Sequence, residues 1–520
     1  MKNKQNWVLI ILAGLILLGF FLRFYHIDLA PSGIYPDEAV NAQDALVALQ
    51  NNDFKWFYPD NDGREALFIN LVAASIAIFG VSAFSLKLPA ILLGTLTILG
   101  TYLLTKELFK NERISLAAAF FTTVSFWAIN FSRISFRANM LPWILVWSFY
   151  FLFRGLNSKK IIHFIAAGAI FGLGLHSYIA FRIAPFVLVG WLPFLILSRS
   201  NFLRDFWRQG LAFVGAFIIV ASPMLFTFYQ EPQYFWSRTN EVSVFSAEVN
   251  HGHPWVTLGE SIKLSLLKYN FIGDMNWRNS FPPFPILNPA LGMLFLWGAL
   301  ISMGLLLRAI YLRIFKGRQL EDLSTHAFLW LWFALLLVPE FMTNEGNPHA
   351  LRAIGTAPVV YIWAAFFVGW LLTVVDKYIG RGKYLIYTFF LLVFIFIGVF
   401  DGLKYFYFWA PRIETARAFE KNITEAAHFI ENSPKELEIY AVLDNMQRVV
   451  VRVFNWERNN FRDIHPRELD KLEIKNPNNV MFVFSDYQKT EIIENLTRRF
   501  PKLVLSTVTD EHGLTYYILK

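Results

Sequence analysis

Long apolar runs dominate the sequence up to about residue 400. Each run has about 17 to 22 residues and hardly any charge, which is the length that an α-helix needs to cross the hydrocarbon core of a membrane. A soluble domain could not cover this much apolar surface, since 55% of the 520 residues are hydrophobic and 18% are aromatic. The pattern therefore predicts a polytopic α-helical membrane protein.

Hydropathy predicts eleven membrane-spanning helices, and an ambiguous segment at 66–81 decides their topology. If 66–81 does not cross, every Lys/Arg cluster between the spans falls on the cytoplasmic side, as the positive-inside rule requires; if it crosses, every cluster lies outside. We therefore expect a cytoplasmic N-terminus, an inner (plasma) membrane location, and outer loops at 26–85 and 229–288. The predicted spans are residues 8–24, 86–105, 114–130, 138–153, 161–178, 182–198, 210–228, 289–309, 326–342, 355–375 and 384–401.

The charged residues exclude some classes of function. The net charge of +8 comes from short Lys/Arg clusters between the apolar runs, where topology requires them, so we expect no nucleic-acid partner. The chain has no cysteine, which excludes disulfides and a Cys-based metal site. The spans carry almost no ionisable groups near their centres, which argues against an ion-coupled transporter. We therefore expect the chemistry to lie at the outer surface.

Two adjacent carboxylates, Asp37 and Glu38, follow the first span in the stretch GIYPDEAVNAQDAL (33–46). They repel each other and lose hydration beside a membrane, so the pair is expected to serve a purpose at the outer face. One purpose is chemistry. The other is structural, with Asp37 as the N-cap of a helix and Glu38 in its first turn, and the two purposes are compatible.

Four arginines lie at the predicted outer ends of helices, where the positive-inside rule disfavours them. They are accompanied by His176 and His349 and are Arg133, Arg137, Arg182 and Arg352. A guanidinium group binds phosphate in a bidentate fork, so the set suggests a site for phosphate or another polyanion. The alternative is that interface arginines reach towards lipid headgroups.

The C-terminal part of the chain has shorter apolar runs, of strand length. Strands are predicted at 437–443, 448–454, 479–485, 502–508 and 514–519, and helices at about 413–431 and 488–499. Alternation of strands and helices is typical of an α/β domain. We therefore divide the chain into a transmembrane domain (1–405) and an extracytoplasmic α/β domain (406–520).

Several motifs in order along residues 1 to about 400 resemble a known family. They are YPDEAVNAQDA (35–45), GREALF (63–68), LKLPAILLGTLTILGTYLLTKELF (86–109), FSRISFRANMLP (131–142), GLHSYIAFRIAP (174–185) and NPHALRAIGTAP (347–358). The set resembles the membrane glycosyltransferases of the C-type fold. Within them it is most similar to the branch of protein O-mannosyltransferases and lipid A aminoarabinose transferases.

The resemblance implies transfer of a monosaccharide from a polyprenyl-phosphate donor to an extracytoplasmic acceptor, which could be a protein, a lipid or a cell-envelope glycan. It makes Asp37 the catalytic carboxylate, which would act as general base. Glu38 becomes a supporting or metal-ligating residue, and a divalent ion at this pair is the candidate cofactor. Arg182 and Arg352, then Arg133 and Arg137, are candidates for the donor phosphate. Further candidate substrate contacts are Tyr35, Glu65, His176, Tyr178 and His349.

Two positions depart from the family pattern. Gly-Arg-Glu-Ala-Leu stands where the aminoarabinose transferases have Glu-Lys-Pro-Pro-Leu, which displaces Glu65 and puts metal binding in doubt. Asn139 stands where many relatives have Asp, so a second catalytic acid is not supported. A lipid or oligosaccharide transporter and an inactive glycan-binding relative stay open as alternatives to the enzyme.

Overall fold

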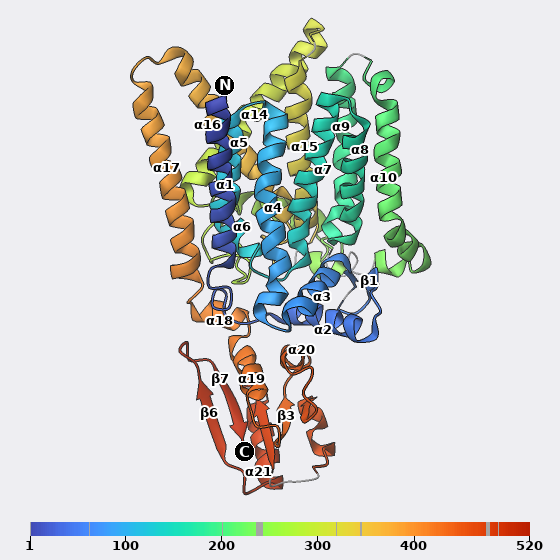
Figure 1. Cartoon of the computed structure of the whole chain (residues 1–520), viewed down its shortest axis with the longest axis vertical. Coiled ribbons are helices and arrows are strands. Elements are labelled where there is room, and N and C mark those ends of the chain that lie inside the picture. Colours follow the sequence, from blue (N-terminus) through green and yellow to red (C-terminus); the bar gives the residue numbers. More distant parts are fainter. Residues whose placement is uncertain are drawn as a thin grey trace.

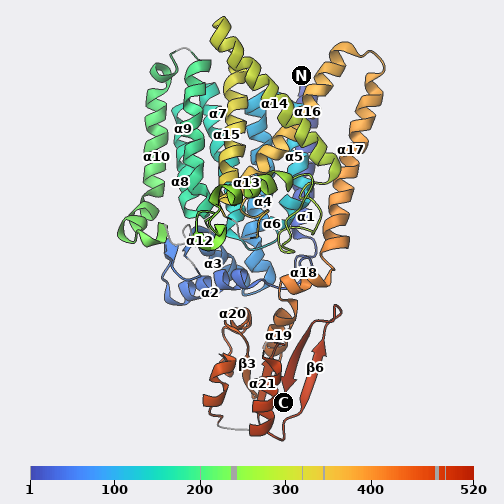
Figure 2. The same cartoon turned by 180° about the vertical axis from the view of Figure 1, so that it is seen from behind.

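The computed structural model describes residues 2–520 except 62, 200, 236–242, 319, 344–345, 475–478 and 487. Part of the predicted outer loop 229–288 therefore lies outside the described residues. The chain forms a helical bundle with a small α/β domain at one end (Figures 1 and 2). We call this end, which also carries α2 (Pro36–Asn51) and α3 (Leu67–Phe79), the loop end of the bundle; the N-terminus lies at the opposite end.

Among the described residues, eight segments are long and apolar enough to cross a membrane: 6–24, 83–109, 179–198, 202–230, 289–316, 322–341, 354–378 and 383–409. Three further helices, α5 (Glu112–Val124), α7 (Met140–Ser158) and α8 (Ile161–Leu173), run beside them (Figure 1). The polytopic helical fold is thus confirmed, while the number of eleven spans and their orientation stay predictions. The bundle helices are α1 (Lys2–Phe24), α4 (Ala83–Phe109), α5 (Glu112–Val124), α7 (Met140–Ser158), α8 (Ile161–Leu173), α9 (Ala184–Ser198), α10 (Phe202–Gln230), α14 (Pro289–Lys316), α15 (Glu321–Phe341), α16 (Ala357–Tyr378) and α17 (Lys383–Leu403).

The predicted span 114–130 is interrupted in the structure. Helix α5 ends at Val124, and α6 (Phe126–Phe131) begins two residues later. Ser125 lies between them with φ −59° and ψ 132°, outside the helical region. Its hydroxyl accepts a hydrogen bond from the Tyr361 hydroxyl at 3.0 Å, so a partner on α16 satisfies this polar group inside the bundle.

The ambiguous segment 66–81 forms α3 (Leu67–Phe79), a helix of 13 residues. Such a helix is about 20 Å long, whereas the hydrocarbon core is about 30 Å thick. Helix α3 lies with α2 (Pro36–Asn51) across the loop end (Figure 1). The segment therefore does not run through the bundle, in agreement with the non-crossing interpretation.

Short elements at the loop end connect the long helices. Strands β1 (Phe57–Tyr58) and β2 (Arg64–Glu65) pair antiparallel, with Phe57 opposite Glu65. The remaining elements between the long helices are short helices. Four are 3-10 helices, η1 (Arg137–Asn139), η2 (Gly174–His176), η3 (Ile179–Ile183) and η4 (Ile354–Thr356), and two are α-helices, α12 (Ala247–Asn250) and α13 (Pro254–Leu267).

The C-terminal domain contains a five-stranded sheet in the order β4-β3-β5-β7-β6. Strand β3 is parallel to β4 and β5, and β7 is antiparallel to β5 and β6. The strands are β3 (Glu438–Val442), β4 (Phe461–Ile464), β5 (Val480–Phe484), β6 (Leu505–Thr509) and β7 (Thr515–Leu519). The other elements are a π-helical turn η5 (Lys404–Trp409), which contains the predicted domain boundary, and α18 (Ile413–Ala418), α19 (Lys421–Glu431), α20 (Asn445–Phe454), η6 (Pro466–Lys471) and α21 (Lys489–Arg499).

The predicted strand 448–454 is wrong, because this segment forms α20. Its run of valines suggested a strand. However, the Asp444 carboxylate accepts hydrogen bonds from the amides of Met446 and Gln447 and so caps a helix. Arg448 and Arg452, four residues apart, then share one face of that helix. The strand that pairs at this edge, β4, lies farther along the chain and was not predicted.

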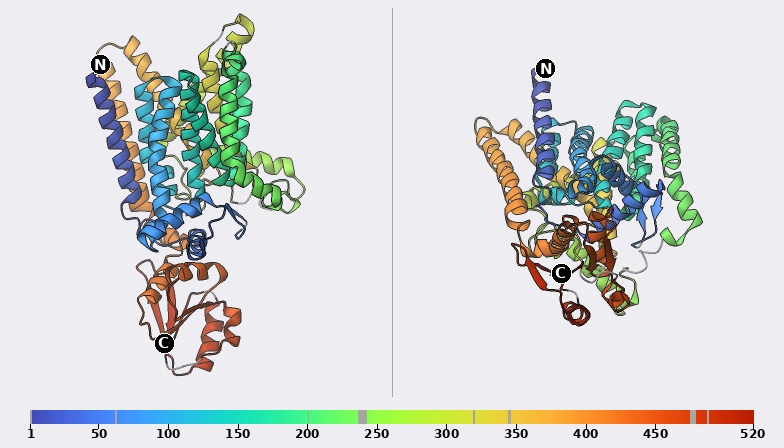
Figure 3. Two further views of the ribbon diagram at one scale, coloured as in Figure 1. Left: turned by 45° about the vertical axis from the view of Figure 1, so that its right-hand side comes forward. Right: turned by 60° about the horizontal axis from the view of Figure 1, so that its bottom comes forward.

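The two domains meet at α2. Figure 3 shows the C-terminal domain directly beneath this helix. Arg452 of α20 donates a hydrogen bond to the Gln43 side chain at 2.9 Å, and the amide of Ile34 donates to the Thr424 hydroxyl at 3.0 Å. Gly33 has φ +95°, and a Cβ atom there would lie 2.4 Å from the carbonyl oxygen of Phe419. Helix α2 thus lies between the bundle and the C-terminal domain.

Candidate functional site

A cavity of about 540 Å³ opens at the loop end of the bundle. Its wall is formed by α2, the hairpin β1–β2, η1, η3 and the turn after α15. Six of the residues predicted from sequence line it: Asp37, Arg137, Tyr178, Arg182, His349 and Arg352. They come from segments up to about 300 residues apart, so tertiary structure brings the predicted set together.

Asp37 lies in the first turn of α2 and faces the cavity. Pro36 starts the helix, because its fixed φ suits the first helical position, and Tyr35 is the N-cap. Asp37 is therefore not the cap. Asn61 donates a hydrogen bond to its Oδ1 at 3.2 Å. The carboxylate stays partly exposed and is available to a ligand in the cavity.

Glu38 points away from the cavity and is completely buried. Its Oε1 accepts a hydrogen bond from the Tyr35 amide at 3.2 Å, and its Oε2 accepts one from the Ser135 amide at 2.6 Å. Burial raises the pKa of this carboxyl. The capping role considered for the acidic pair thus falls to Glu38, which also holds the 132–139 turn. Both oxygens are directed at the backbone, which suits the supporting role expected for Glu38 better than the metal-ligating one.

Arg137 and Arg182 share one buried carboxylate, that of Glu65. The Glu65 Oε2 lies 3.5 Å from the Arg137 Nε, and its Oε1 lies 3.4 Å from the Arg182 Nη2. The Arg182 guanidinium also stacks on the rings of Phe228 and Phe235, at 5.0 and 4.5 Å from their centroids. Glu65 is a member of the predicted set that supports the cavity wall from behind.

Arg64 completes the polar wall and was not among the residues predicted from sequence. Its Nη1 donates to the Asn41 Oδ1 at 2.9 Å, its Nε donates to the Asp60 carbonyl at 3.2 Å, and its Nη2 forms an ion pair with Asp44. Burial raises the pKa of Asp44, against the opposing effect of Arg64. The available signal was the spacing of Asp37, Asn41 and Asp44, which places all three on one face of a helix.

Arg352 and His349 enter from the turn between α15 and α16. The Arg352 Nη1 donates to the Thr343 hydroxyl at 2.8 Å. Among the described residues, the cavity therefore has four lining arginines, Arg64, Arg137, Arg182 and Arg352, together with the Asp37 carboxylate. Such a cluster suits a phosphate group, because guanidinium forks match its oxygens.

Three other residues of the predicted set lie outside this cavity. Arg133 is buried and donates to the carbonyls of Ala30, Leu22 and His26 at 2.8, 2.8 and 3.0 Å, so it ties the end of α1 to the loop. It neither faces the cavity nor reaches towards headgroups, in contrast to both expectations. The His176 Nε2 lies 3.0 Å from the Val220 carbonyl oxygen, and the ring of Tyr35 lies 3.9 Å beneath the Arg278 guanidinium.

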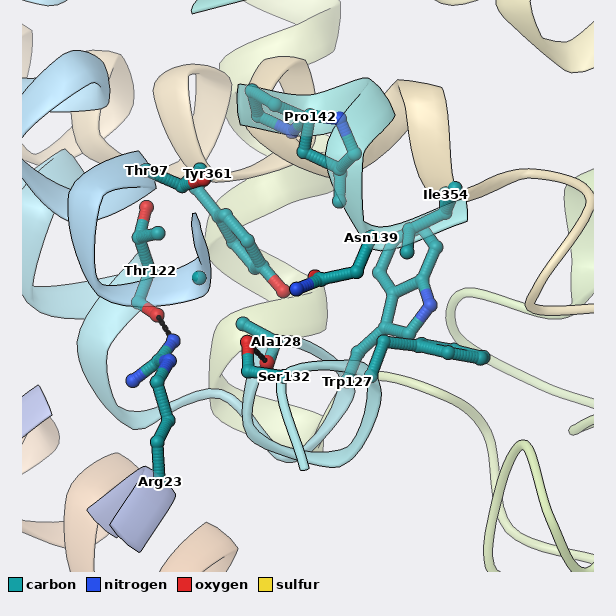
Figure 4. Close-up of a pocket in the computed structure, with 14 residues that line it drawn as sticks. Arg23, Thr97, Thr122, Trp127, Ala128, Ser132, Asn139, Pro142, Ile354 and Tyr361 are labelled. Atoms are coloured by element: carbon teal, nitrogen blue, oxygen red, sulfur yellow. Dashed lines mark hydrogen bonds between the residues drawn. The ribbon is translucent and has the colours of Figure 1, made fainter. Parts of the chain in front are cut away.

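A second, much smaller cavity of about 30 Å³ lies inside the bundle (Figure 4). Arg23, Asn139 and Tyr361 line it, and Arg23 donates to the Thr122 carbonyl at 2.9 Å. Asn139 donates to the Ala90 carbonyl at 2.8 Å; it lines this small cavity and not the one that Asp37 lines. The volume of this small cavity suits one or two water molecules and excludes a sugar.

Over the described part of the chain, no group of three or more His, Asp and Glu side chains is arranged to hold a metal ion. Of the proposed pair of ligands, only Asp37 faces the cavity.

Parts of the chain are similar to membrane glycosyltransferases. The family model for dolichyl-phosphate-mannose-protein mannosyltransferases matches residues 67–226. An undecaprenyl phosphate-alpha-4-amino-4-deoxy-L-arabinose arabinosyl transferase of Pseudomonas aeruginosa is 27% identical over 280 residues, 49% of this chain and 47% of that protein. A putative mannosyltransferase of Bacillus subtilis, YkcB, is 25% identical over 236 residues, 43% of this chain and 31% of that protein. The matched region spans about half the length of the arabinosyl transferase.

Two solved structures are similar over 99% of the chain. One is ArnT from Cupriavidus metallidurans bound to undecaprenyl phosphate, with 12% identity, 98% of that chain covered and a TM-score of 0.55. The other is the archaeal oligosaccharyltransferase AglB from Archaeoglobus fulgidus, in complex with an inhibitory peptide and a dolichol-phosphate. It has 15% identity, 74% of that chain covered and a TM-score of 0.52. The chain thus has the C-type glycosyltransferase fold and resembles in sequence the protein O-mannosyltransferases and aminoarabinose transferases, as its motifs predicted.

Proposed function

We propose that this protein transfers a monosaccharide from a polyprenyl phosphate to an extracytoplasmic acceptor in the cavity at the loop end. One observation carries the proposal: the partly exposed Asp37 carboxylate and four arginines line the same cavity. The similarity to transferases that act on undecaprenyl phosphate supports it.

The arginines bind the donor phosphate. When the bond between the anomeric carbon and the phosphate oxygen breaks, negative charge grows on the leaving polyprenyl phosphate, and fixed guanidinium groups stabilise that charge. Arg137 and Arg182 are held by Glu65 behind the wall, so they need little rearrangement during the reaction. Arg352 and Arg64 complete the cradle from the other sides of the cavity.

Asp37 acts as the general base. It removes the proton from an acceptor hydroxyl while the hydroxyl oxygen attacks the anomeric carbon on the face opposite the phosphate. Asn61, which donates to one carboxylate oxygen, orients the group and leaves the other oxygen for the proton. Tyr178 and His349 line the same space and contact the sugar or the phosphate.

The apolar part of the wall suits the lipid tail. Ile183, Phe186 and Met342 line the cavity towards the bundle, and Phe186 is largely exposed on α9. A polyprenyl chain lying against these side chains keeps its hydrocarbon in the membrane while its phosphate reaches the arginines. The protein is accordingly a multi-pass protein of the inner membrane, with the cavity and the C-terminal domain outside the cytoplasm. The acceptor approaches from the side of the C-terminal domain.

A donor screen tests the proposal. The purified protein in detergent is offered a panel of undecaprenyl-phosphate monosaccharides, and sugar release or transfer to a membrane extract is measured. Asp37→Asn should lower turnover by about 10²- to 10⁴-fold, the usual contribution of a general base. Asp53→Asn, at an exposed aspartate just after α2, is the matched control. Equal turnover in Asp37→Asn and wild type would refute the assignment of the base. No turnover with any donor would favour a transporter or a binding protein.

A further inference from the structure

A completely buried ion pair lies beside the turn that carries His349 and Arg352. Lys268 follows the end of α13, Glu340 is the penultimate residue of α15, and both side chains have 0% exposure. The Lys268 ammonium donates a hydrogen bond to the Glu340 Oε2. It donates a second hydrogen bond to the Ser265 carbonyl oxygen, at 3.0 Å. Desolvation of the two charges offsets most of their attraction. A pair of apolar side chains of similar volume often makes a folded protein just as stable. Stability alone is therefore a weak explanation for this pair.

The second carboxylate oxygen of the pair has a different partner. Glu340 Oε1 accepts a hydrogen bond from the backbone amide of His349 at 2.9 Å. The Glu340 carbonyl also accepts from the Thr343 hydroxyl at 2.9 Å, and the same hydroxyl accepts from the Arg352 Nη1 at 2.8 Å. Glu340 thus holds His349 through its side chain, and it is linked to Arg352 through its backbone carbonyl and the Thr343 hydroxyl.

The next residue of the turn is held in the same way from another segment. Asp274, which is 1% exposed, accepts the backbone amide of Ala350 through Oδ2 at 2.7 Å. Its own position is fixed by the Asn279 side chain at 3.0 Å and the Asn276 amide at 2.8 Å. Two consecutive amides, 349 and 350, are therefore held by buried carboxylates from two different elements.

We propose that Glu340 and Asp274 form a carboxylate clamp that positions His349 and Arg352 against the phosphate of the donor. The clamp rests on the proposed function, because it serves the same cavity. Its members are positioning residues: they contact the backbone of the turn and not the substrate. Lys268 neutralises Glu340 and keeps it oriented.

Position matters here because a guanidinium group binds phosphate through a planar fork. A turn that moves by about 1 Å can lower the rate of a reaction by about 10² even when every side chain is present. The clamp holds the backbone amides of residues 349 and 350. It thereby positions the backbone from which the His349 and Arg352 side chains extend, without occupying the cavity.

A pair of double variants separates positioning from simple stability. Lys268→Met with Glu340→Gln removes both charges but keeps an oxygen that accepts the His349 amide. Lys268→Met with Glu340→Leu removes the acceptor as well. We expect the Gln version to bind undecaprenyl phosphate within about threefold of wild type and the Leu version at least tenfold more weakly, a loss of about 1.4 kcal/mol. Binding is measured by tryptophan fluorescence in detergent on protein that elutes as a single folded species.

A third comparison shows whether the clamp acts through Arg352. In an Arg352→Ala background the difference in affinity between the Gln and Leu versions should shrink, since one positioned group is gone. A purely structural role would leave that difference unchanged. If the Leu version does not fold, the affinities of Asp274→Asn and Asp274→Ala for undecaprenyl phosphate are compared instead. Asn keeps an oxygen that can accept the Ala350 amide and Ala does not, so the Ala variant should bind more weakly.

Each outcome is informative. Equal affinity of the Gln and Leu versions overturns the clamp and leaves the proposed function intact. Failure of the wild-type protein to bind undecaprenyl phosphate overturns both.

Discussion

Replacing Glu65 by Gln should destabilise the free protein and strengthen its response to a phosphate ligand. Glu65 is 3% exposed, and its partners Arg137 and Arg182 are 9% and 13% exposed, so water screens these ion pairs poorly. At about 3.5 Å each attraction is roughly 5 kcal/mol with an effective dielectric constant of 20, before desolvation is subtracted. Removing one partner of a buried pair costs about 3 to 5 kcal/mol. Since the Gln oxygen keeps one contact, we expect a loss of about 3 kcal/mol.

Bound undecaprenyl phosphate should restore much of the folding stability that Glu65→Gln loses. In the wild-type protein the Glu65 carboxylate competes with the donor phosphate for the two arginines, whereas in Glu65→Gln that competition is absent. Undecaprenyl phosphate should therefore bind at least about tenfold more tightly, which corresponds to about 1.4 kcal/mol. Bound ligand stabilises the folded state by mass action, so its effect on the unfolding temperature should be larger in the variant.

Thermal unfolding followed by tryptophan fluorescence, with and without undecaprenyl phosphate, measures both effects. Glu468→Gln is the control, because Glu468 is 62% exposed and lies 3.8 Å from Arg448 in a surface ion pair. Such a pair contributes about 1 kcal/mol or less. The reasoning is refuted if Glu65→Gln is as stable as wild type, or if the ligand stabilises both proteins equally.

Two further predictions concern the region around α2. Gly33→Ala should loosen the contact between α2 and the C-terminal domain, because φ is +95° and the new Cβ would lie 2.4 Å from the Phe419 carbonyl oxygen. Limited proteolysis near residue 420 should therefore become faster. Gly14→Ala is the control and should leave the rate of proteolysis unchanged, since the space around its Cβ is open. Glu38→Gln should gain stability relative to wild type as pH rises. Burial raises the pKa of Glu38 above its ordinary value of 4.5, so from about pH 4.5 up to the folded-state pKa the unfolded chain releases a proton that the folded protein retains. Unfolding measured between pH 4 and 8 should show this divergence, and a difference that stays constant with pH would contradict it.

Much of the candidate site could be predicted because its residues carry local signals. Asp37 follows an apolar run, and Arg137, Arg182 and Arg352 break the expected charge bias at helix ends. Such exceptions in a membrane protein are visible without coordinates, since a misplaced charge is costly wherever the chain folds. The structure places all four at one cavity.

Other residues carried no comparable signal. Arg133 breaks the charge bias just as Arg137 does, yet it bonds to three backbone carbonyls and faces away from the cavity. Glu38 stands next to Asp37 in sequence, but successive side chains of a helix diverge by about 100°, so the two carboxylates face different surroundings. Arg64 joins the cavity wall through Asn41, 23 residues away, and Asp274 holds the Ala350 amide, 76 residues away.

The sequence by itself determined the membrane class, the course of the long helices and most strands of the C-terminal domain, because these depend on how apolar residues repeat over a short window. Tertiary structure decided which arginines share a cavity with Asp37, which carboxylates support them, and that 448–454 is a helix. The physical reason is that a buried polar group must find partners wherever the fold supplies them. Those partners here lie in segments far apart in the chain, and no local pattern records the pairing.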